Sequence, residues 1–168
     1  MFKLKQFYLK QKVFSMTDRY KIYDDQQKEL YEVRSKLLSI TNKMEFTRIS
    51  DGQVLFHFQK QLLHLMSTYT LMDGNHQKLA TVKRKLAFVN KKVSVETSET
   101  TYQVEGNFTG HQFSIMNQGQ EVANLRKKWI SWGDAYEISV FQDDHAEFFL
   151  ALVILLDSMF HEEGKNRN

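Results

Sequence analysis

Short stretches of alternating hydrophobic and polar residues recur along most of the chain, and polar turn sequences separate them. The clearest alternating stretches lie at 20–23, 43–49, 69–71, 93–95 and 136–141. Such alternation in segments rich in aromatic and β-branched residues indicates strands with one buried face. Turn sequences rich in Asp, Asn, Ser and Gly lie at 24–26, 50–52, 73–75, 97–99 and 117–119. These residues favour tight hairpin turns.

A basic signature repeats along the same region. Its copies read QKVFS, SKLLS, KQLLH, RKLAF and KKWIS, at 11–15, 35–39, 60–64, 84–88 and 127–131. The steps from Lys12 to Lys36, Gln61 and Lys85 are 24, 25 and 24 residues, and the next step, to Lys128, is 43. The last step is close to two shortened units, with a degenerate copy between them. A period in this range indicates one supersecondary unit used several times, here a hairpin with its link.

Six such units predict a mainly β domain of about twelve antiparallel strands. We place them near 7–15, 18–24, 29–39, 43–49, 53–64, 67–72, 78–88, 91–97, 101–108, 111–116, 121–131 and 134–141. A meander of this length leaves an exposed edge unless it closes into a barrel. A twelve-stranded barrel is too wide for its own side chains to fill, so it needs a plug.

The C-terminal segment supplies that plug. Phe148 to Leu156 are nine consecutive apolar residues, and Met159 and Phe160 extend the run. As a helix, 148–160 would span about 20 Å, less than the ~30 Å of a bilayer core. An all-apolar helix of this length is typical of a buried one. We predict a central helix over 144–161, capped by Asp143 or Asp144 and followed by a frayed tail over 164–168. The plug residues are Phe148, Phe149, Leu152, Leu155 and Leu156.

The order of these motifs resembles the LURP-one-related family, in particular its bacterial branch. The resemblance rests on the segments YLKQKVFS at 8–15, DRYKIYD at 18–24 and LYEV at 30–33, followed by the terminal helix. It covers nearly the whole chain, as one domain over 1–168. It implies a fold similar to the tubby C-terminal domain and the phospholipid scramblases, in which twelve strands surround a C-terminal helix.

The resemblance implies less about function, because function does not follow from fold alone. Tubby domains bind phosphoinositides, and scramblases act at membranes. Scramblases also carry a calcium-binding segment, whereas the acidic pairs at 24–25 and 143–144 are too sparse for one here. No lipid-binding residue of these families is carried over to this chain.

The amino-acid composition excludes several kinds of functional site. The 168 residues include no cysteine and no proline, and 23 Lys and Arg against 20 Asp and Glu give a net charge of +3. Disulfides, cysteine nucleophiles and thiolate metal sites are therefore excluded. The N-terminus lacks a secretory signal pattern, so we expect a cytoplasmic protein.

The sequence contains no recognisable catalytic or metal-binding motif. The six histidines are His57, His64, His76, His111, His145 and His161, and none pairs with another at helix-ligand spacing. Serine-hydrolase, P-loop and dinucleotide-binding signatures are also missing. We therefore expect a non-enzymatic domain without cofactor or metal, with a site assembled from distant loops for a small ligand or a reaction as the alternative.

Basic residues are the strongest functional candidates. The densest groups contain Lys83, Arg84 and Lys85, and Arg126, Lys127 and Lys128. Lysines also recur near the same point of each repeat, so a closed barrel would place them at similar heights. They either protect strand ends from aggregation or bind anionic groups such as phospholipid headgroups.

Trp129 and Trp132 beside the second basic group resemble a nucleic-acid-binding face. Three residues apart in a strand, they lie on opposite faces, so we expect at least one to be in the core. A net charge of +3 does not favour nucleic acid. The preferred interpretation is a binding or scaffold domain with anionic membrane lipids or a protein as partner, peripheral to the membrane.

Overall fold

The computed structural model describes residues 4–10, 19–36, 43–63, 66–85, 92–108, 110–131 and 133–165. Its strands are β1 Lys5–Lys10, β2 Arg19–Tyr23, β3 Glu29–Lys36, β4 Lys43–Arg48, β5 Val54–Leu63, β6 Met66–Asp73, β7 Lys78–Lys85, β8 Lys92–Thr97, β9 Thr101–Asn107, β10 Gln112–Asn117, β11 Gln120–Ile130 and β12 Gly133–Val140. All neighbours are antiparallel, and β1 pairs with both β2 and β12. The sheet is a closed barrel in sequence order, which confirms the predicted twelve-stranded architecture.

Alternation along the strands sends one set of side chains to the barrel interior. Val82 of β7 lies opposite Val95 of β8, and both are fully buried. Polar residues at neighbouring positions, such as Lys83, face outward and are exposed. The period-two pattern in the sequence therefore records which face of the sheet meets the core.

The β9–β10 pair depends on one glycine. Gly106 lies opposite Phe113 and has a φ of +143°. A Cβ at this position would come within 2.4 Å of the Gln112 carbonyl oxygen and 2.6 Å of the Phe113 Cα. Both the close approach of the backbones and the positive φ therefore require glycine here.

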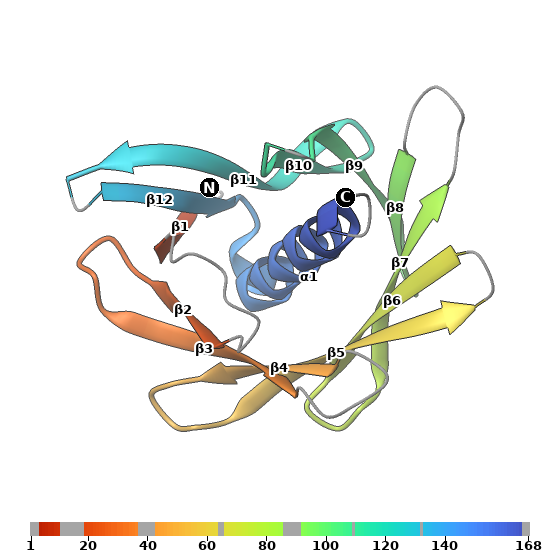
Figure 1. Cartoon of the computed structure of the whole chain (residues 1–168), viewed down its shortest axis with the longest axis horizontal. Helices are drawn as coiled ribbons and strands as arrows, with labels where there is room; N and C mark the ends of the chain where they lie inside the picture. The colour runs from red at the N-terminus through yellow and green to blue at the C-terminus, as the bar shows by residue number, and fades with distance from the viewer. Residues whose placement is uncertain are drawn as a thin grey trace.

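The helix α1, Ala146–Lys165, lies in the centre of the ring of strands (Figure 1). Every residue from Phe149 to Leu156 is at most 1% exposed. These include the predicted plug residues Phe149, Leu152, Leu155 and Leu156, whereas Phe148 is half-buried and packs against the core. The helix is apolar around its whole circumference because strands cover it on every side.

The ends of the helix differ from the prediction. A short 3-10 helix, Asp143–His145, precedes α1, and Gln142, the residue before it, makes no side-chain capping hydrogen bond. Asp143, in this 3-10 helix, forms an ion pair with Lys5, 2.5 Å away. The α-helix begins at Ala146, two residues later than predicted, and continues through Gly164 to Lys165. The predicted end at 161 is therefore wrong, and residues 164 and 165 belong to the helix and not to a frayed tail. The last residues, 166–168, lie outside the described part.

Short turns define one end of the barrel, which we call the turn end. In two of them an aspartate accepts two backbone N–H groups: Asp24 from Gln26 and Lys28, and Asp73 from Asn75 and Gln77, all at 2.9–3.0 Å. Since α1 begins after β12, the helix also enters from this end. The repeated aspartates therefore have a structural role in forming hairpins.

We call the opposite end the basic end, because six strands finish or begin there with a basic residue. These are Lys10, Arg19, Lys36, Lys43, Lys85 and Lys92, on β1, β2, β3, β4, β7 and β8. The predicted recurrence of lysine at similar barrel heights holds for Lys36, Lys60, Lys85 and Lys128, which lie toward the basic-end termini of β3, β5, β7 and β11. Lys12 lies outside the described residues.

Within the parts of the chain that the structure describes, no helix is both long and apolar enough to cross a bilayer.

A charge in the centre of α1 tests the packing. We expect Leu152→Asp to prevent folding, because the carboxylate would enter an interior with no solvent and no partner, at a cost of several kcal/mol. Leu152→Ala, the matched control, should fold with a loss of about 2–5 kcal/mol. Urea denaturation and circular dichroism measure both, and a cooperatively folded Leu152→Asp variant would show that α1 is not the core.

Candidate functional site

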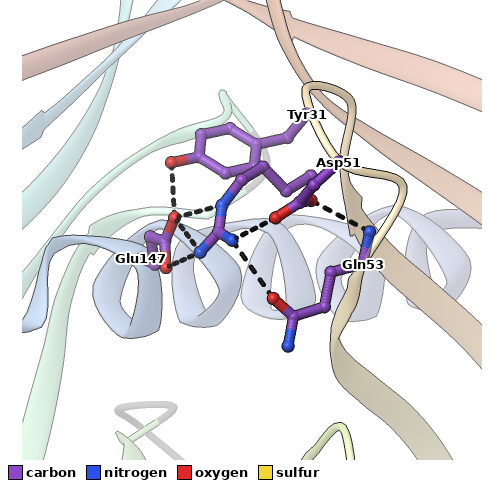
Figure 2. A network of polar contacts seen from close by, with 5 residues as sticks. Tyr31, Asp51, Gln53 and Glu147 are labelled. Atoms are coloured by element: carbon purple, nitrogen blue, oxygen red, sulfur yellow. Dashed lines mark hydrogen bonds and ion pairs between the residues drawn. The ribbon is translucent and has the colours of Figure 1, made fainter.

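A polar network at the turn end fixes the start of the central helix. The Arg48 guanidinium of β4 donates from Nε and Nη2 to Glu147 of α1, at 3.1–3.3 Å. Its Nη1 donates to Asp51 at 2.8 Å and to Gln53 at 3.2 Å. The Tyr31 hydroxyl of β3 donates to Glu147 Oε1 at 2.8 Å. Figure 2 shows the Tyr31 hydroxyl pointing at the Glu147 carboxylate, while Asp51 and Gln53 lie on the other side of the guanidinium.

The electrostatics of this network favour a structural role. Burial, followed by the hydrogen bond to Glu147, raises the pKa of the Tyr31 hydroxyl far above its ordinary value. The backbone N–H of Gln53 and the Arg48 side chain lower the pKa of Asp51. At neutral pH the tyrosine is therefore a neutral donor, and the network joins strands β3 and β4 to the first turn of α1.

A second set of contacts holds the other half of the helix. Nδ1 of His111, in the β9–β10 connection, lies 2.7 Å from Asp157 Oδ1 of α1. The Phe108 ring stacks on Phe160, with centroids 4.3 Å apart. The connection therefore contacts α1 through both an ion pair and an aromatic pair. Asp157, which interrupts the apolar run, was the sequence signal for this contact, but it did not identify the partner.

The first predicted basic group lies at the end of β7. Lys83 faces outward and its Nζ forms an ion pair with Glu96 of β8 at 2.7 Å, with 49% of the lysine side chain exposed. The backbone of Arg84 and Lys85 continues β7 opposite Val93 and Lys92, while their side chains lie outside the described part of the structure.

The second predicted basic group lies on β11. Arg126 is half-buried and donates to the carbonyl oxygens of Phe113 at 2.7 Å and Leu125 at 2.9 Å, and to Ser114 Oγ at 2.7 Å. It therefore bridges β10 and β11 within the wall. Lys127 and Lys128 are exposed, and Lys128 Nζ lies 3.7 Å from Glu137 of β12.

The two groups share one end of the barrel without meeting. Strands β8, β9 and β10 separate β7 from β11. At ~4.8 Å between neighbouring strands, the groups are about 20 Å apart along the wall. The basic residues are therefore distributed around a rim rather than gathered in one pocket.

Trp129 is the most exposed large hydrophobic residue among the described side chains, at 82%. It lies next to Lys127 and Lys128, one residue before the end of β11. The expectation that at least one tryptophan of the pair is in the core does not hold for Trp129, and Trp132 lies outside the described residues. The strand continues past the core at this end, where no neighbour covers the indole.

The histidines do not form a metal centre among the residues that can be described. His57 and His76 stack with ring centroids 3.9 Å apart and an interplanar angle of 18°. Ring-nitrogen lone pairs lie in the ring planes, so stacked rings do not converge on one ion. No group of three or more His, Asp or Glu side chains in the described part is arranged to hold a metal.

Comparison with known proteins identifies the family of this barrel and its helix. The family model described as LURP-one-related matches residues 5–157, which include every strand and most of α1. The chain belongs to the LURP-one-related family. This confirms the resemblance read from the order of the sequence motifs.

Two further comparisons found one similar sequence and one similar structure. "Uncharacterized protein YxjI" from Bacillus subtilis (strain 168) is 25% identical over 156 residues, covering 93% of this chain and 94% of that protein. An X-ray structure of a protein from Arabidopsis thaliana covers 92% of this chain and 91% of its own, with a TM-score of 0.64 and 16% identity. The second likeness shows the fold alone. Family and fold fit a binding or scaffold domain.

The His111–Asp157 pair makes the stability of this LURP-one-related domain depend on pH. The hydrogen bond to Asp157 raises the pKa of His111 from 6.5, against the opposing effect of burial. A raised folded-state pKa contributes stability that is fully present below pH 6.5 and is lost as pH rises through the folded value. At pH 6 we expect Asp157→Asn to lower the free energy of unfolding by about 1–3 kcal/mol. The difference from wild type should shrink toward pH 9 in urea titrations.

Asp143→Asn is the control, because it also removes a carboxylate from an ion pair, but the partner is a lysine and not an imidazole. Its effect on the free energy of unfolding should stay constant from pH 6 to 9. The assignment is wrong if the Asp157→Asn difference shows the same flat profile.

Proposed function

We propose that this domain is a non-enzymatic binding module that docks on anionic phospholipid headgroups with its basic end. The observation that carries the proposal is the distribution of charge along the barrel axis. Basic residues occupy the ends of six strands at the basic end, whereas the aspartates of the turns, including Asp24, Asp51 and Asp73, lie at the turn end. An anionic surface would attract the first end and repel the second.

The rim arrangement suits a flat partner. Lysines and arginines near an anionic membrane contribute about 1 kcal/mol each, and the attraction decays within a Debye length of ~8–10 Å. A planar surface reaches a ring of charges at the same time, whereas a small ligand reaches one sector. Because single contributions are small, binding would be weak and sensitive to salt.

The observed ion pairs leave the exposed lysines available for exchange. Lys83 pairs with Glu96 and Lys128 with Glu137, and both lysine side chains remain 49% exposed. The Lys83–Glu96 pair is exposed on both sides, and such pairs contribute only ~0.2–1 kcal/mol, so a lipid phosphate can replace that carboxylate at low cost. The Lys128–Glu137 contact is longer, at 3.7 Å. Arg126 differs, because its bonds to backbone carbonyls hold β10 and β11 together. We therefore assign headgroup contact to Lys83, Arg84, Lys85, Lys127 and Lys128.

Vesicle co-sedimentation tests the proposal. We expect the protein to pellet at low salt with vesicles of 70% phosphatidylcholine and 30% phosphatidylserine, and not with phosphatidylcholine alone. Combining Lys83→Gln, Lys127→Gln and Lys128→Gln should reduce lipid affinity roughly tenfold or more, because three contributions of ~1 kcal/mol are removed.

The matched control combines Lys5→Gln, Lys28→Gln and Lys78→Gln at the turn end. It changes the net charge by the same amount and, like the first variant, includes lysines in ion pairs and lysines on the surface. Its lipid affinity should stay within about twofold of wild type. An equal loss of lipid affinity in both variants would show that binding depends on net charge and not on the basic end. Absence of pelleting at low salt would refute lipid docking.

A further inference from the structure

We propose that Trp129 inserts into the membrane interface, so that the barrel stands on its basic end. This rests on the proposed function and adds the residue that enters the bilayer and the orientation of the domain. The three supporting observations are the exposure of the indole, its position on β11 and the lysines around it.

The position of Trp129 follows from the alternation along β11. Leu125 points into the barrel and is 1% exposed. Trp129, four residues later, has the same parity but is 82% exposed. The strand has therefore continued past the packed interior, and the indole lies at the rim of the basic end.

No other large hydrophobic side chain in the described part is exposed at this end. The remaining exposed ones are Leu4, which precedes β1, and Ile49, which follows β4. Both lie at the turn end. The exposed aromatic ring and the basic rim thus occur at the same end of the barrel.

Lysines lie close to Trp129 at the rim, whereas its direct cross-strand partner on β12 is Asp134. Lys127 and Lys128 precede Trp129 on β11, and Ala135 of β12 pairs with both Lys128 and Lys10 of β1. At ~4.8 Å per strand, Lys10 is about 10 Å from Lys128, and both face outward. Trp129 has the inward parity of β11, so it shares a surface with these lysines only at the rim, beyond the packed interior. Tryptophan favours the boundary between headgroups and acyl chains, and flanking lysines contact the phosphates.

A single nucleic-acid strand fits these observations less well than a bilayer. Such strands follow a basic groove that stacks successive bases on aromatic side chains. Here the basic residues are spread around a rim, over β1, β2, β3, β4, β7, β8 and β11, and Trp129 lies at one point of it. A plane contacts all of these strand ends together, so the rim favours a bilayer as partner.

Tryptophan fluorescence tests the insertion directly. The chain has two tryptophans, so Trp132→Phe leaves Trp129 as the only indole. With vesicles containing 30% phosphatidylserine and brominated phosphatidylcholine, we expect its emission to shift to shorter wavelength and to be quenched. Trp129→Ala should lower vesicle affinity by about tenfold, since a large aromatic surface no longer leaves water.

Trp129→Phe is the matched control and keeps an aromatic ring while reporting from Trp132 alone. Circular dichroism shows whether Trp132→Phe folds. If it does not, Trp129 is assessed by difference: quenching that the wild type shows and Trp129→Phe lacks comes from Trp129.

The outcomes separate this inference from the proposed function. Pelleting with unquenched Trp129 emission overturns insertion and leaves electrostatic docking in place. Absence of pelleting overturns both. An emission change with a single-stranded DNA oligonucleotide, without one on vesicles, assigns Trp129 to nucleic-acid contact and overturns the membrane proposal.

Discussion

The structure depends on the mutual burial of one apolar helix and the twelve-stranded wall around it. Residues 149–156 form two turns of α1 without an exposed side chain, which is possible only where apolar strands cover all sides. The barrel in turn has a width that its own side chains cannot fill. Neither part has a solvent-compatible surface without the other, so we infer that they fold as one unit.

Hydrophobic burial does not specify how far the helix is inserted, because it is not directional. The polar contacts supply that information. Glu147 near the start of α1 binds Arg48 and Tyr31, and Asp157 in its second half binds His111. A shift along the barrel axis would break both sets together and leave partly buried charges without partners. Two acidic residues that flank the buried apolar run 149–156 thereby define the register of the helix.

The sequence predicted the parts of the fold that depend on local patterns. Alternation and turn aspartates located the strands, and the apolar run at 148–156 located the helix. Long-range polar pairs could not be predicted from local patterns. Arg48 and Glu147 are 99 residues apart, and in the sequence each resembles a solvated surface charge. The same limit applies to the basic groups: the repeat placed Lys85 and Lys128 at similar heights, but only the strand order shows that three strands lie between them. The exposure of Trp129 could not be predicted, because alternation predicts the face of a strand and not where the core ends.

Native-state hydrogen exchange of the α1 amides tests the dependence of helix and barrel on each other most directly. If the two form one cooperative unit, the amides of residues 150–156 and those of central strands such as β5 and β6 should exchange with the same free energy, equal to that of global unfolding in urea. Exchange of the helix amides at a free energy several kcal/mol lower, with the strands still protected, would show that the barrel persists without its helix and would contradict the account.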